Sequence, residues 1–142
     1  MDVRTTIPGR GHALSLSIQD VLTGIARAWS REFRRAAAAG RPYPVLYRSH
    51  VRFRHEPPGQ DFEEWADPPT VLRRGYGDCD DLIIYRLAEL LAVGEQASVQ
   101  VMRELEDPSD PANPRDTGRF HVAIRRQDGR EEDPSRILLT RQ

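Results

Sequence analysis

Apolar side chains recur at three- and four-residue steps between residues 15 and 39. They are Ile18, Val21, Leu22, Ile25, Trp29 and Phe33. This spacing predicts a long amphipathic helix, which Ser15 or Ser17 can cap and Gly40 can end. The remaining face carries Arg27, Arg31, Arg34 and Arg35. We interpret that face as solvated and not membrane-bound, because so small a core needs the apolar side of the helix.

A second helical pattern covers residues 79–93 and ends at Gly94. Its apolar stripe consists of Leu82, Ile83, Leu87, Leu90 and Leu91. Asp78 is a suitable N-cap, and Asp80 and Asp81 complement the positive end of the helix dipole. Before it, Pro68 and Pro69 can open a shorter helix that Gly75 ends.

Alternating apolar and polar residues predict strands at 51–55, 99–103 and 120–125. The pair Asp128-Gly129 is a hairpin signal after the last of these. Residues 56–67 and 106–118 are polar and rich in proline or acids, which predicts loops. A loop as long as 106–118 is uncommon in a compact domain and is often a lid or a binding loop.

The composition predicts one globular domain spanning 1–142. The chain has 142 residues, of which 38% are hydrophobic and 30% charged, enough for a core and too few polar residues for a disordered chain. No apolar run approaches the roughly 20 residues of a membrane span, and no leader peptide is evident. We therefore expect a cytoplasmic protein without membrane contact.

All 21 basic residues are arginine, which we attribute mainly to codon usage, and their distribution is uneven. Residues 1–55 carry 10 Arg against three acids, whereas residues 56–142 carry 11 Arg against 19 acids. This basic N-terminal region is either a solvated surface or a docking face for a protein partner. Nucleic acid is not expected, because no zinc pattern, RNA-binding motif or glycine loop accompanies the arginines.

The single cysteine, Cys79, excludes an internal disulfide and is the only thiol available for chemistry. The predicted helix places it in a first turn, where free amides and the helix dipole favour a thiolate. His121, on a predicted strand, is a candidate base, and Asp133 follows it across the turn. A metal site is not expected, because zinc ligands normally come in closely spaced pairs that this sequence lacks.

The spacing of His121 and Asp133 raises a geometric difficulty. A two-residue turn at Asp128-Gly129 would place Asp133 opposite Ile124, about 10 Å along the strand from His121 at 3.3 Å per residue. A bulge, a wider loop or a different register is therefore needed if the two side chains are to meet.

These residues resemble a known family. The run Trp65-Ala-Asp-Pro-Pro-Thr-Val-Leu-Arg-Arg-Gly-Tyr-Gly-Asp-Cys-Asp-Asp81, the helix after it, Phe120-His121-Val122-Ala123 and Asp133-Pro134 resemble the transglutaminase-like cysteine proteinase superfamily. The likeness covers residues 62–138 and is closest to small bacterial and phage-associated members. It implies an α+β, papain-like core in which the cysteine helix packs on an antiparallel sheet. The helix at 15–39 lies outside this motif.

The resemblance also implies roles for individual residues. Cys79 would be the nucleophile, His121 the general base and acid, and Asp133 the residue that orients the imidazole. The Cys79 amide would hold the oxyanion together with one further donor, for which the candidates are Tyr76, Trp65 and Gln60. Asp80 and Asp81 either cap and solvate the helix or bind substrate. No cofactor is implied.

The leading hypothesis is a thiol hydrolase or acyltransferase that acts on amide bonds of a peptide or protein. We favour hydrolysis, because an acceptor site for crosslinking is not visible in so short a chain. The alternative is a non-catalytic binding or assembly module on the same fold, of phage or prophage origin, which could be associated with the virion. The basic N-terminal region would then be its docking surface.

Overall fold

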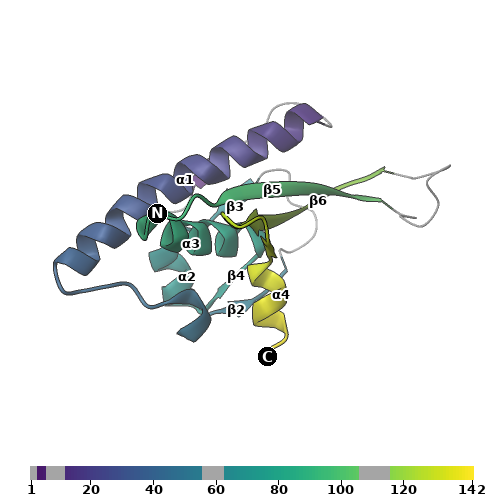
Figure 1. The fold of residues 1–142 in the computed structure, drawn as a ribbon. Helices are drawn as coiled ribbons and strands as arrows, with labels where there is room; N and C mark the ends of the chain where they lie inside the picture. The colour runs from purple at the N-terminus through teal and green to yellow at the C-terminus, as the bar shows by residue number, and fades with distance from the viewer. Residues whose placement is uncertain (1–2, 6–11, 56–62, 106–115) are drawn as a thin grey trace.

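The computed structural model describes residues 3–5, 12–55, 63–105 and 116–142 (Figure 1). In chain order the elements are β1 (Val3–Thr5), α1 (His12–Ala38), the 3-10 helix η1 (Leu46–Arg48), β2 (Arg52–Phe53), β3 (Glu63–Trp65), α2 (Pro68–Arg74), β4 (Tyr76–Gly77), α3 (Cys79–Ala92), β5 (Ser98–Leu105), β6 (Asp116–Arg125), β7 (Glu131–Glu132) and α4 (Pro134–Leu139). The described chain therefore combines helices with small sheets, as the α+β expectation requires.

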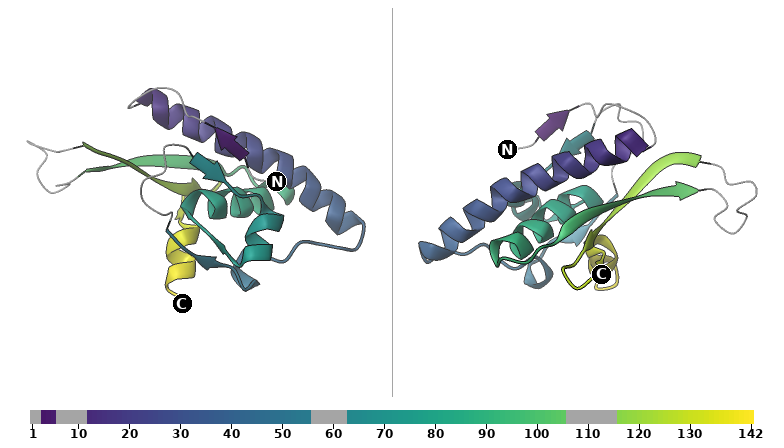
Figure 2. Two further views of the ribbon diagram at one scale, coloured as in Figure 1. Left: turned by 180° about the vertical axis from the view of Figure 1, so that it is seen from behind. Right: turned by 45° about the horizontal axis from the view of Figure 1, so that its top comes forward.

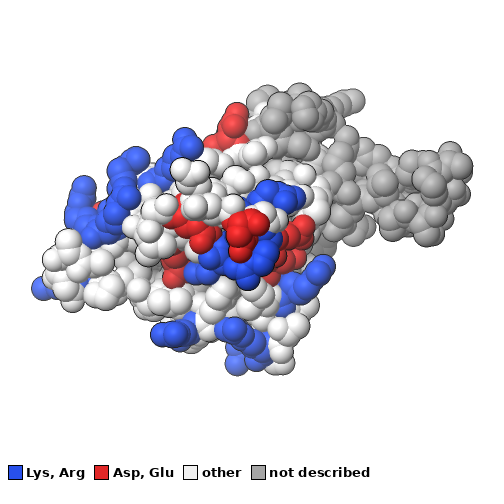
Figure 3. Space-filling view, in the orientation of Figure 1, with Lys and Arg blue, Asp and Glu red and all other residues white. Residues whose placement is uncertain are grey.

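The helix α1 has an apolar side that is buried and a basic side that is not. Leu22 and Ala26 are fully buried in a core cluster with residues of α3 and the β5–β6 pair. The arginines predicted to form a solvated face, Arg27, Arg31, Arg34 and Arg35, are all exposed. Figures 1 and 2 show α1 running across α3 and β5, and Figure 3 shows basic side chains along its C-terminal end.

The helix α3 is buried on nearly every side. Ile83, Ile84 and Leu87 join the cluster shared with α1, whereas Leu82 and Tyr85 join a second cluster that includes Leu46, Val71 and Leu138. Such a helix needs apolar residues around most of its circumference, and its sequence provides them. Because α3 lies between these two clusters, its first residue, Cys79, is carried by a helix that is packed on both sides.

The three-stranded antiparallel sheet has the order β5-β6-β7. In β5 and β6, Val99 pairs with Ile124 and Val101 with Val122, and these side chains face α1 and α3. The strand predicted at 51–55 is shorter, Arg52–Phe53, and pairs in parallel with β4. A separate antiparallel pair, β1 with β3, places Val3 opposite Trp65.

The hairpin between β6 and β7 has a wider turn than the sequence predicts. Arg126 N donates to Arg130 O at 2.7 Å and Gly129 N to Arg126 O at 2.9 Å, so three residues, 127–129, form the loop. Gly129 has a φ of 89°, and no other residue of the described turn has a positive φ. This matches a three-residue loop that ends in a left-handed glycine, not the two-residue turn that we predicted.

The wider turn changes the register by one residue. Ile124 pairs with Glu132 and Arg125 with Glu131, so the residue after β7, Asp133, continues the register opposite Ala123 and not Ile124. A one-residue shift transfers a side chain to the other face of a sheet. Asp133 thus lies on the same face as His121, one diagonal step away, where long side chains can meet.

Candidate active site

Cys79 is the first residue of α3, and the turn before it is closely packed. Asp78 is the N-cap and accepts a hydrogen bond from Asp81 N at 3.0 Å, while Asp81 Oδ2 accepts one from Asp78 N at 3.1 Å. This capping box confirms Asp78 as the predicted cap. A Cβ on Gly77 would stand 3.0 Å from the Asp81 Cβ and 3.2 Å from a Leu82 methyl, so a side chain there would crowd the start of α3.

Asp81 ties the start of α3 to two other segments. Its carboxylate, which is 2% exposed, accepts a hydrogen bond from Ala66 N at 2.7 Å and pairs with Arg74 at 2.6 Å. Arg74 also stacks on the ring of Tyr76, 4.4 Å from its centroid. Asp81 therefore takes part in capping α3, and its alternative role in substrate binding stays a prediction.

Asp80 lies between the thiol and an indole. Trp65 Nε1 donates to Asp80 Oδ2 at 3.1 Å, and the Cys79 thiol donates to Asp80 Oδ1 at 3.7 Å. Burial, together with the negative charges of Asp78 and Asp81, raises the pKa of Asp80 to about 7 although the Trp65 bond opposes this. Asp80 therefore carries a proton for part of the time at neutral pH, while its two oxygens contact Cys79 and Trp65.

His121 and Asp133 are joined directly. His121 Nε2 lies 2.6 Å from Asp133 Oδ2, and the other carboxylate oxygen accepts hydrogen bonds from Ser135 Oγ at 2.6 Å and Arg136 N at 3.2 Å. Burial alone would raise the pKa of Asp133, but the hydrogen bonds from Ser135, Arg136 and His121 hold it below its usual value. Asp133 is thus ionised at neutral pH.

An ionised carboxylate can only accept hydrogen bonds, so the proton in this contact is on His121 Nε2. In the neutral imidazole the other nitrogen, Nδ1, then has a free electron pair and is the basic atom. Asp133 therefore selects one tautomer of the ring, which is the arrangement in which a carboxylate orients a catalytic histidine.

Cys79 and the His121 side chain lie toward different faces of β6, the strand to which His121 belongs. Cys79 packs against the core cluster that contains Val122 and Ile124, whereas alternation along β6 turns His121 to the opposite face. The Cys79 thiol contacts Asp80, and the His121 imidazole contacts Asp133. The strand β7 pairs with residues 124 and 125 of β6, and Asp133, which follows β7, contacts His121 at the same edge of β6.

The other candidates occupy different places. Tyr76 lies between the guanidinium groups of Arg54 and Arg74, 4.5 and 4.4 Å from its ring centroid. Trp65 is buried, with its indole N–H directed to Asp80. Gln60 and most of the predicted 106–118 loop lie outside the described residues, whereas residues 116–118 belong to β6.

Two residues near this site, Ser135 of α4 and Glu132 of β7, were not predicted from the sequence. Ser135 donates to Asp133, and Glu132 anchors the strand that leads to it. The Asp133-Pro134-Ser135 run is a helix N-terminus signal, a cap followed by proline at the first position, and it could have been recognised. Asp133 is therefore both a helix cap and the partner of His121.

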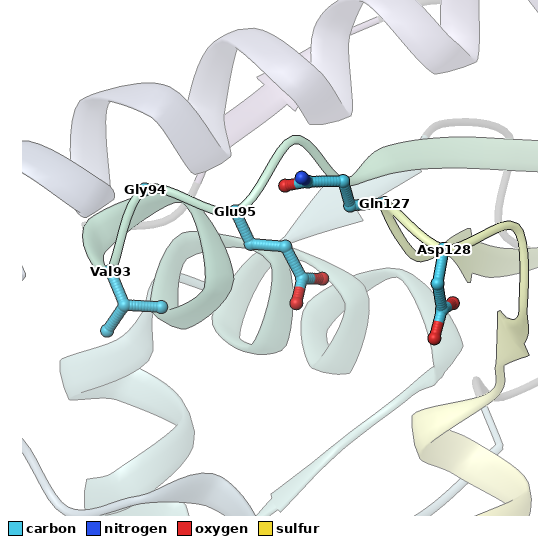
Figure 4. Close-up of a pocket in the computed structure, with 5 residues that line it drawn as sticks. All are labelled: Val93, Gly94, Glu95, Gln127 and Asp128. Carbon is cyan, nitrogen blue, oxygen red and sulfur yellow. The ribbon is translucent and has the colours of Figure 1, made fainter.

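An open pocket lies at the other end of α3, lined by Val93, Gly94, Glu95, Gln127 and Asp128 (Figure 4). The length of α3 places it about 20 Å from Cys79, at 1.5 Å per residue. The carboxylates of Glu95 and Asp128 each pair with an arginine, Arg126 and Arg130 respectively. This pocket is therefore not part of the Cys79 site.

The described residues hold no group of three or more His, Cys, Asp or Glu side chains arranged to bind a metal ion. In the same part of the chain, none of the helices is both long enough and apolar enough to cross a bilayer. Comparison with known proteins finds no matching family model, curated protein or solved structure.

Proposed function

We propose that this protein is a transglutaminase-like thiol hydrolase or acyltransferase that acts on amide bonds of peptides or proteins, with Cys79, His121 and Asp133 as its catalytic residues. The observation that carries the proposal is the 2.6 Å contact between His121 Nε2 and Asp133 Oδ2, which leaves Nδ1 as the basic nitrogen. The position of Cys79 at the first residue of a capped helix and the family resemblance of residues 62–138 support it.

The proposed reaction uses these atoms in two steps. His121 Nδ1 takes the thiol proton, the Cys79 sulfur attacks the amide carbon, and the tetrahedral oxyanion collapses as the C–N bond breaks. The imidazolium gives its proton to the leaving amine, which leaves a thioester on Cys79. Water then attacks the thioester with His121 as base, releasing the acid and the thiol. A second amine in place of water would give acyl transfer, but we favour hydrolysis.

The oxyanion would be held by backbone and side-chain donors near the start of α3. The Cys79 amide is one of the first N–H groups of α3, at the positive end of the helix dipole, where an oxyanion is stabilised. Of the two candidate side chains that the structure describes, Tyr76 and Trp65, we favour Tyr76 as the second oxyanion donor. The indole N–H of Trp65 already donates to Asp80. Asp80 is uncharged for part of the time at neutral pH, which lowers its repulsion of a thiolate.

An activated ester tests the nucleophile without knowledge of the substrate. With p-nitrophenyl acetate, the proposal predicts a burst of one p-nitrophenolate per chain, an acetyl group on Cys79 by mass spectrometry, and slow turnover. Cys79→Ala should abolish the burst, and His121→Ala should slow it. A wild-type rate no faster than that of a small free thiol, and unchanged in His121→Ala, would refute the catalytic assignment.

A second candidate function is a binding or assembly module in which these residues are not used. One observation favours it: the Cys79 thiol donates a hydrogen bond to the carboxyl group of Asp80. The exposed arginines of α1 would then dock an acidic protein partner, and such a complex should weaken as salt rises. We propose the cytoplasm as the site of a hydrolase, and a virion-associated location for the assembly module.

A further inference from the structure

We propose that Glu132 and Arg86 are positioning residues for the His121–Asp133 pair, linking the hairpin that carries the pair to the helix that carries Cys79. The inference rests on the proposed function, and it assigns to this site a second set of residues that never contact substrate. The resemblance assigns no role to Glu132 or to Arg86.

Glu132 receives donors from three separate parts of the chain. Its Oε2 accepts from Arg86 Nε of α3 at 2.7 Å and from the Tyr47 hydroxyl of η1 at 2.5 Å, and its Oε1 accepts from Arg126 at 2.7 Å. The Glu132 side chain is only 12% exposed. On the face shown in Figure 3, acidic and basic side chains interleave where α3 meets the hairpin.

The donors keep Glu132 charged inside the protein. Burial alone would raise the pKa of Glu132, but the hydrogen bonds from Arg86, Tyr47 and Arg126 hold it below its usual value. Arg86 is further stacked on Tyr47, 4.9 Å from the ring centroid, and lies 3.5 Å from Glu89. Removing one partner of such a network is costly because it leaves a buried charge uncompensated.

Glu132 is the last paired residue before Asp133, and this is why its position matters. It pairs with Ile124, and its side chain points to the α3 side of the sheet, whereas the next residue points to the His121 side. A slip of one residue at Glu132 would move the Asp133 carboxylate to the wrong face. The contacts of Glu132 with α3 therefore fix which face Asp133 occupies.

Arg86 connects this anchor to the nucleophile. It follows Cys79 by seven residues, which is two helical turns, so both side chains leave α3 on the same side. The distance along the helix is about 10 Å at 1.5 Å per residue. The pair Arg86–Glu132 thus holds the hairpin against the face of α3 that begins with Cys79.

The test is Glu132→Gln, which keeps the size of the side chain and removes its charge. The matched control is Glu95→Gln, which removes the other carboxylate bound to Arg126 and leaves Glu132 intact. The first readout is the tautomer of His121, measured from the ring ¹⁵N shifts. We expect a single Nε2–H tautomer in the wild type and in Glu95→Gln, and a mixture in Glu132→Gln.

The second readout is the rate at which iodoacetamide alkylates Cys79 between pH 5 and 9. We expect Glu132→Gln to lower the rate at neutral pH by about tenfold, as loss of a supporting contact behind a functional side chain commonly does. If Glu132→Gln does not fold, Arg86→Met with Glu132→Leu replaces the charges by apolar groups and takes the same two readouts.

The outcomes separate this inference from the proposed function. An unchanged His121 tautomer in a folded Glu132 variant overturns the positioning role, whatever the alkylation rate. A mixed tautomer supports it even if alkylation proves independent of His121, in which case the catalytic function alone fails.

Discussion

Asp133 reaches His121 along a diagonal of the sheet, because the three-residue turn puts it on the same face. The 2.6 Å contact between the two side chains depends on that register. Gly129 makes the turn possible, because its φ of 89° is one that residues other than glycine rarely adopt.

Substituting this glycine should therefore weaken the hairpin. We expect Gly129→Ala to lower the free energy of unfolding by about 1–2 kcal/mol, the cost of a left-handed conformation. Gly24→Ala is the matched control, because Gly24 lies inside α1 with open space around it and should gain about 0.5–1 kcal/mol. Urea unfolding measures both, and equal effects of the two changes would contradict the turn geometry.

The lowered pKa of Asp133 makes stability depend on pH in a defined direction. The pKa of Asp133 is lower in the folded protein than in the unfolded chain, where an aspartate has a pKa of about 3.9. The stability that ionised Asp133 contributes is thus present above pH ~4, and it is lost as the pH falls through the pKa that Asp133 has in the folded protein. Asp133→Asn should be less stable than the wild type at pH 7, and the gap should close in acid. A gap that widens on acidification would contradict this.

Asp80 should behave in the opposite way. Because burial raises its pKa to about 7, its favourable contribution is complete below pH ~3.9 and is lost as the pH rises through 7. Asp80→Asn retains an acceptor for Trp65 and removes the charge that faces Asp78 and Asp81. Its unfolding free energy should rise relative to the wild type between pH 5 and 8. Parallel curves for the two proteins would show that Asp80 does not titrate in this range.

Asp81 should be the most costly carboxylate to remove near the site. Asp81→Ala leaves Arg74 without its partner and the amides of Ala66 and Asp78 without an acceptor, which we expect to cost about 3–5 kcal/mol. Glu32→Ala removes an exposed pair with Arg35 and should cost less than about 1 kcal/mol. Thermal unfolding of the two variants checks the contrast, which similar losses would refute.

Local signals predicted α1, α2 and α3, but α4 was not predicted. The three- and four-residue apolar spacing gave α1 and α3 with ends within a few residues, and Asp78, Gly75 and Gly94 are at the ends of helices as expected. These features follow from neighbouring residues, so the sequence contains them directly. The mixed helix and sheet class follows from the same patterns.

Long-range geometry was harder to predict. The Asp128-Gly129 pair fits both a two- and a three-residue turn, and only the pairing of Arg126 with Arg130 decides between them. The network around Glu132 joins residues far apart in the sequence, 47 with 132 and 86 with 132, which no local pattern reveals. The contact between Trp65 and Asp80 also joins residues that are distant in the sequence. It gives the indole N–H a partner that spacing alone could not predict.

The most direct test of the central claim is the pH dependence of alkylation at Cys79 in the wild type and in His121→Ala. The chain has one cysteine, so the iodoacetamide rate reports a single site. The proposed dyad predicts rapid alkylation below pH 7 in the wild type, and in His121→Ala a rate typical of an ordinary thiol with a pKa of about 8.5. A thiol that is inert in both proteins, or equally reactive in both, would contradict the pairing of Cys79 with His121.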